Sequence, residues 1–140
     1  ECSMFCRYRA IGLDWETEIL PFSERMTEYA FGAVAGKQGR VAYLSFVKDV
    51  VPDCDCAPWS DAPVVADQGI LASLDPVAID QAAYDLVKAA PALAGSALEG
   101  KAGPGDDKFL VLHPNSKPLA QLEHGERIGL GTRSYELRRV

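Results

Sequence analysis

The sequence predicts an α/β fold with a small mixed sheet flanked by about three helices, and α+β is the alternative. Runs rich in β-branched and aromatic residues alternate with segments whose apolar residues recur at helical spacing. Crossovers through those helices favour parallel pairing in at least part of the sheet. A length of 140 residues suits one domain, which we expect over 21–140 with a separate segment over 1–20.

The first half of the domain predicts one helix and two strands. A helical pattern begins at Phe22, with Ser23 as its N-cap, and Gly36 ends it. Residues 41–47 predict a buried strand, and residues 69–73 predict a second one. The expected apolar stripe of the helix consists of Phe22, Met26, Tyr29, Ala30 and Ala33.

Asp75 and Pro76 open the clearest helix of the sequence. Asp75 suits the N-cap and Pro76 the first helical position, and Pro91 ends the helix. Its apolar stripe is expected to face the core, with Gln81 and Tyr84 on the other side. Further along, we expect a flexible glycine-rich segment (95–108), a strand (109–112), a helix (118–128) and an edge strand (134–137).

The composition excludes several classes of partner. The formal net charge is −6 and the basic residues are scattered, which argues against nucleic acid. No apolar run approaches the roughly 20 residues that cross a bilayer, so no membrane partner is expected. The short cysteine spacings are typical of metal ligands or reduced thiols, so we expect a reducing compartment, the cytoplasm.

The run Asp53-Cys54-Asp55-Cys56 is the strongest chemical signal in the sequence. In an extended backbone, Cys54 and Cys56 project to one face and can chelate one soft metal ion. The carboxylates of Asp53 and Asp55 disfavour a bare thiolate, and a bound cation reverses that penalty. The alternative is a pair of small buried hydrophobes in a turn.

Two thiolates leave a metal's coordination shell open. Asp53, Asp55, Asp67 or His113 could complete it, and zinc and iron are the candidate metals. Cys2 and Cys6 could also do so, giving a tetrahedral zinc tetrad with Cys54 and Cys56.

Three aspartates are candidate catalytic residues. Asp75 is first of all a helix cap, although a helix N-terminus also attracts anions. Asp80 lies one turn further along, near the border of the apolar stripe, and Asp67 lies in the preceding loop. Clustered carboxylates in different environments can share acid and base roles on a small anionic substrate.

The longer pattern around these residues resembles a known family. It combines Pro52-Asp53-Cys54-Asp55-Cys56, Pro63 to Ser73, Asp75 to Asp80, Gly129-Leu130-Gly131 and Tyr135-Glu136-Leu137. The sequence resembles the domain-of-unknown-function family 362, usually described as uncharacterised iron–sulfur-centre proteins, from about residue 2 to the C-terminus. Members commonly carry an upstream ferredoxin-like insert with C-x2-C-x2-C-x3-C-P spacing.

The resemblance implies a cofactor and a partner. Cys2 and Cys6 match the last C-x3-C step of the insert, so residues 1–20 are expected to be a remnant of the cluster motif and a linker. Arg7 stands where proline is usual, and the first two cysteines of the motif are missing. The sequence opens on Glu1, which favours a C-terminal piece of a longer protein that carries an iron–sulfur cluster.

Three functions stay open. The first is the body domain of an iron–sulfur or electron-transfer protein that supports an upstream ferredoxin-like module or redox partner and carries a thiolate metal site. The second is an enzyme that acts on a small anionic substrate through its aspartates. The third is a structural or assembly domain with inert cysteines, which as a truncated piece would self-associate into homo-oligomers.

Overall fold

The computed structural model describes residues 7–8, 10, 19–37, 39–54 and 56–140. The predicted mixture of helices and a small sheet is confirmed. Cys2, Cys6 and Asp55 lie outside the described residues, so the expectations placed on them stay predictions. In chain order the elements are α2 (Ile19–Val34), β1 (Tyr43–Val47), β2 (Gly69–Ser73), α3 (Pro76–Ala89), α4 (Lys108–Leu112) and α5 (Ala120–Arg127).

The sheet of the described residues is an antiparallel pair, β1 with β2. Tyr43 pairs with Ser73 and Val47 with Gly69. The expected parallel pairing is wrong here, because no described helix lies between the two strands to bring the chain back in the same direction. The strands themselves fall where the sequence predicts them.

One face of this sheet is covered and the other is open. The exposed side chains Leu44, Phe46 and Ile70 alternate along the strands with more buried ones and are between 59% and 66% exposed. The expectation of a strand buried on both faces is therefore wrong for the outer face. An apolar outer face is unusual for an antiparallel sheet, which normally turns polar residues to water.

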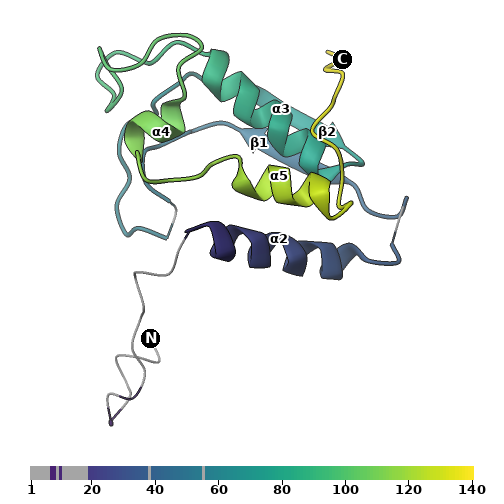
Figure 1. The fold of residues 1–140 in the computed structure, drawn as a ribbon. Helices are drawn as coiled ribbons and strands as arrows, with labels where there is room; N and C mark the ends of the chain where they lie inside the picture. The colour runs from purple at the N-terminus through teal and green to yellow at the C-terminus, as the bar shows by residue number, and fades with distance from the viewer. Residues whose placement is uncertain (1–6, 9, 11–18, 38, 55) are drawn as a thin grey trace.

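The helix α3 covers the inner face of the sheet (Figure 1). Asp75 caps it as predicted, since its Oδ1 accepts hydrogen bonds from the backbone N–H groups of Val77 and Ala78, both at 2.9 Å. Gln81 and Tyr84, expected to face solvent, are buried. Arg133 donates to Gln81 Oε1 at 2.8 Å, and the Tyr84 ring stacks on Phe109 at 5.4 Å.

The glycine-rich segment is anchored, contrary to the expectation of flexibility. Leu98 is 0% exposed and packs in the apolar core. The amine of Lys108 is also buried, and it donates to the carbonyls of Lys88 (2.7 Å) and Gly103. Burial lowers the pKa of Lys108. The buried core residues around Leu98 are Val47, Val64, Val65, Val87 and Ala90.

Two expected strands are absent from the described residues. The strand over 109–112 is wrong, because Asp107 caps a helical turn there by accepting from Leu110 N at 3.1 Å. Residues 134–137 pair with no strand; Tyr135 instead donates to Asp85 at 2.9 Å. The helix expected over 118–128 is confirmed as α5.

The helix α2 is rotated about its axis relative to the prediction, so that the edge of the expected apolar stripe, not its centre, faces the neighbouring helices. It begins at Ile19, so Ser23 lies inside the helix rather than at its cap. Its buried side chains are Ser23 and Thr27, whereas Phe22 and Tyr29 of the expected apolar stripe are exposed. Figure 1 shows α2 lying along α5, which in turn packs on α3. Among the described helices, none is both long and apolar enough to cross a membrane.

Candidate functional site

Asp53, Cys54 and Cys56 lie in an exposed turn after β1. The backbone N–H of Ala57 donates to the Cys54 carbonyl at 2.8 Å, so the backbone bends here and the alternation of an extended strand does not apply. Cys54 and Cys56 are both exposed. The alternative of two buried hydrophobes is therefore not what the structure has.

Local hydrogen bonds bring polar groups to the Cys54 sulfur. The backbone N–H of Cys56 approaches Cys54 Sγ at 3.5 Å, which favours negative charge on that sulfur. Trp59 Nε1 donates to Asp53 Oδ2 at 3.3 Å and so holds one carboxylate beside the turn. A hollow of about 390 Å³ opens between Asp53, Cys54 and Trp59.

His113 reaches the same turn from a distant part of the sequence. Its Nε2 lies 2.8 Å from the Pro52 carbonyl oxygen, across 61 residues of sequence. A carbonyl only accepts, so Nε2 carries a proton, and in the neutral imidazole Nδ1 then keeps its lone pair. Histidines that bind metals commonly donate their other ring N–H to a backbone carbonyl in this way.

These residues fit part of a metal site. Two thiols and an imidazole are ligands that zinc and iron accept. Within the described residues, however, no group of three His, Cys, Asp or Glu side chains stands close enough together to hold an ion. Asp55, Cys2 and Cys6, the other predicted ligands, fall outside that part of the protein.

Asp67 holds a backbone turn. Its Oδ1 accepts from the backbone N–H of Asp49 at 2.9 Å. Asp49 has a φ of 48°, a left-handed conformation that costs energy for a residue with a side chain. The hydrogen bond from Asp67 offsets part of this cost, so the structure gives Asp67 a local structural task.

Asp75 joins the start of α3 to the C-terminal segment. Its Oδ1 caps the helix while its Oδ2 accepts from Thr132 N at 2.9 Å. A Cβ at Gly131 would lie 2.1 Å from Asp75 Oδ1, so only glycine allows this approach. The Gly129-Leu130-Gly131 run is thus a turn shaped by contact with Asp75.

Asp80 is the candidate aspartate that lines a cavity. It borders a space of about 600 Å³ between α2, β1, α3 and the α4–α5 connection. Burial raises the pKa of Asp80, because the apolar wall disfavours its charged form, while the exposed part of the side chain still meets water. Asp67 and Asp75 do not line this cavity.

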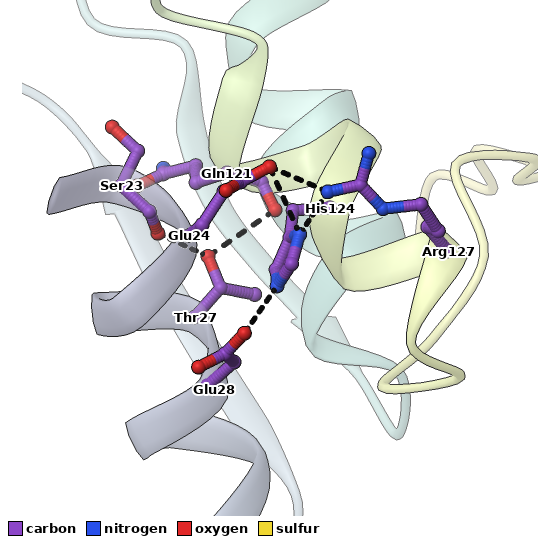
Figure 2. A network of polar contacts seen from close by, with 7 residues as sticks. All are labelled: Ser23, Glu24, Thr27, Glu28, Gln121, His124 and Arg127. Atoms are coloured by element: carbon purple, nitrogen blue, oxygen red, sulfur yellow. Dashed lines mark hydrogen bonds and ion pairs between the residues drawn. The ribbon is translucent and has the colours of Figure 1, made fainter. Parts of the chain in front are cut away.

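The α2–α5 contact is a polar network that the sequence analysis missed (Figure 2). His124, whose side chain is 8% exposed, lies 3.2 Å from Glu28 Oε1 and 3.5 Å from Glu24 Oε1. Arg127 donates to Glu24 and contacts His124 Nδ1. The guanidinium only donates and the Glu28 carboxylate only accepts, so the neutral imidazole with its proton on Nε2 fits both.

A sequence signal for this network exists. Glu24 and Glu28 are four residues apart on one helix, and His124 and Arg127 are three apart on another, so each pair shares a helix face. Thr27 lies between the two glutamates and donates to the carbonyl of Ser23 at 2.8 Å and, more weakly, to that of Gln121 at 3.4 Å. The network ties the helices together; its groups are not arranged as a catalytic set.

The fold and the exposed turn describe a small mixed α/β domain with a closely spaced cysteine pair. A family model described as a domain of unknown function (DUF362) matches residues 6–85, more than half of the sequence. The chain therefore belongs to this family. The match includes the cysteine turn and all three candidate aspartates, and it ends before His113. No curated protein and no solved structure matches the sequence.

Proposed function

We propose that this protein is the body domain of a redox-associated iron–sulfur protein, and that Cys54 and Cys56 supply thiolates to a soft metal ion or cluster. The observation that carries the proposal is the hydrogen bond from His113 Nε2 to the Pro52 carbonyl. This bond orients an imidazole at the cysteine turn, with the nitrogen lone pair that a metal takes.

The accessibility of the thiols supports the same proposal. Both side chains are exposed, so an ion can reach them without unfolding the core. The Cys56 N–H near Cys54 Sγ stabilises the deprotonated sulfur that a metal requires. When bound, such a centre would supply electron transfer or Lewis acidity, while the protein residues hold and orient it.

The remaining ligands would come from elsewhere in the protein. Cys2 and Cys6 have the C-x3-C spacing that ends a ferredoxin-like motif. The proposal therefore places a ferredoxin-like module upstream of this domain, and that module would be its redox partner. Asp53, held by Trp59, is the described carboxylate closest in sequence to the thiols.

The test is metal analysis of the protein made from its complete reading frame under anaerobic conditions. Either zinc or iron with acid-labile sulfide should co-purify with the protein, and Cys54→Ser with Cys56→Ser should lower the metal content by at least one ion per molecule. His113→Ala should weaken metal retention against a chelator by about 10–100-fold. His124→Ala is the matched control and should retain the metal, because His124 lies in the α2–α5 network.

A second measurement uses the 140-residue protein alone. Cobalt(II) added to the reduced protein should give thiolate-to-cobalt absorption in the near ultraviolet, and the double serine variant should lack it. Metal-free full-length protein whose thiols all titrate, together with no cobalt signal from the 140-residue protein, would overturn the proposal.

A further inference from the structure

The cavity beside Asp80 has the size and composition of a small-molecule site. Its volume of about 600 Å³ lies within the roughly 300–1,000 Å³ that such sites occupy. It shares no lining residue with the hollow at the cysteine turn. Most of its wall is apolar, with contributions from Phe22, Val47, Val50, Val87, Phe109 and Leu122.

Asp80 places a carboxylate in this wall. Within the described residues it has no hydrogen bond or ion pair from another side chain, and burial raises its pKa. A carboxylate in apolar surroundings is stabilised by an incoming cation or a strong hydrogen-bond donor, and it repels an anion. The negative charge of Asp80 therefore disfavours the small anionic substrate that the sequence analysis considered for the three aspartates.

Ser116 supplies a second polar group that lacks a partner. It lines the cavity, and its Oγ is shut off from solvent without any hydrogen bond. An unsatisfied buried hydroxyl is unfavourable, but an oxygen that water cannot reach is also closed to a ligand in the open cavity, so the ligand preference depends on Asp80. Lys117 contributes an ammonium group to the lining and is exposed, as Asp80 is; burial raises the pKa of Asp80, whereas the long stem of Lys117 can carry its ammonium group into water.

The aromatic residues of the cavity wall also favour a cationic ligand. Phe22, Tyr84 and Phe109 line the same space as Asp80, and aromatic faces attract organic cations. We infer that this cavity binds a small amphipathic amine, with its apolar body against the aromatic side chains and its ammonium group at the Asp80 carboxylate. This inference does not depend on a metal at the cysteine turn.

Three probes of nearly equal shape test the inference. 2-Phenylethylamine, 2-phenylethanol and 3-phenylpropionate are titrated into the ¹⁵N-labelled 140-residue protein and followed by NMR. The amine should bind at least about tenfold more tightly than the carboxylate, because a hydrogen bond to a charged group adds over one kcal/mol. The shifted amides should lie in β1, α3 and the α4–α5 connection.

Variants assign the preference to one carboxylate. Asp80→Asn should abolish the advantage of the amine, Asp80→Glu should keep most of it, and Asp67→Asn should leave it unchanged because Asp67 lies outside the cavity. Equal affinity for the three probes, shifts centred elsewhere, or an amine preference that survives Asp80→Asn would each overturn the inference. Folding of every variant is checked by circular dichroism.

Discussion

Among the described helices, the two longest, α3 and α2, are held in opposite ways. α3 buries Val77, Ile79 and Val87 against the sheet and α5. α2 buries Ser23 and Thr27, joins α5 through charged groups, and leaves Tyr29 84% exposed. A helical apolar stripe therefore identifies a face that prefers to avoid water, but it does not say which face this fold covers.

The largest effect is expected on the α3 side. Leu98→Ala removes a fully buried side chain from the apolar core and should cost about 2–5 kcal/mol of unfolding free energy. Leu74→Ala, at a 74% exposed position, is the control and should change it by less than about 0.5 kcal/mol. Urea unfolding measures both, and a Leu98→Ala cost below about 1 kcal/mol would contradict the core described here.

A smaller effect on stability is expected in the polar network between α2 and α5. His124→Ala removes the hydrogen bond to Glu28 and the contact with Arg127, and should cost about 1–2 kcal/mol. The exposed Arg127–Glu24 pair makes part of this network sensitive to salt. Hydrogen exchange should show α2 opening before α3 in the variant. If α2 and α3 open together, the two regions are not held separately.

Asp80 predicts a pH effect of known sign. Folding raises its pKa above the ordinary 3.8, so its contribution to stability is present at low pH and is lost as the pH rises through the raised value. Asp80→Asn should thus be more stable than the native protein at pH 7, by less than about 1 kcal/mol because the group is partly exposed. The two proteins should converge near pH 3, as thermal unfolding would show.

The smallest effect is expected on the outer face of α2. Tyr29→Ser should change the unfolding free energy by less than about 0.5 kcal/mol, because the side chain packs on little. Thr27→Ala on the inner face should cost more, near 1 kcal/mol, since it removes the hydrogen bond to Ser23. If Tyr29→Ser cost more unfolding free energy than Thr27→Ala, the face of α2 that carries Tyr29 would be the buried one, as its apolar stripe predicted.

Local signals predicted most of the elements. Asp75 and Pro76 mark the start of α3 by capping chemistry alone, and β1 and β2 are short β-forming runs between turn residues. The prediction of a strand from Phe109 to Leu112 is wrong, because so short an apolar run shows neither helical nor strand periodicity. The N-cap from Asp107 favours a helix there.

Long-range contacts could not be predicted in the same way. His113 meets Pro52 across 61 residues, and His124 meets Glu28 across 96. Nothing in the composition of either segment specifies such a pairing, which depends on how the helices pack. For the candidate site, the sequence predicted the cysteine pair and three aspartates, and the structure gives Asp67 and Asp75 hydrogen bonds to backbone N–H groups.

The double contact of Asp75 has a practical consequence for handling the protein. The carboxylate that starts the central helix also receives the Thr132 amide, through a turn that tolerates no side chain at Gly131. Trimming the tail back to Ile128 would therefore loosen residues 75–78, more than fifty positions away. An affinity tag that replaces residues 129–132 would disturb the same contact.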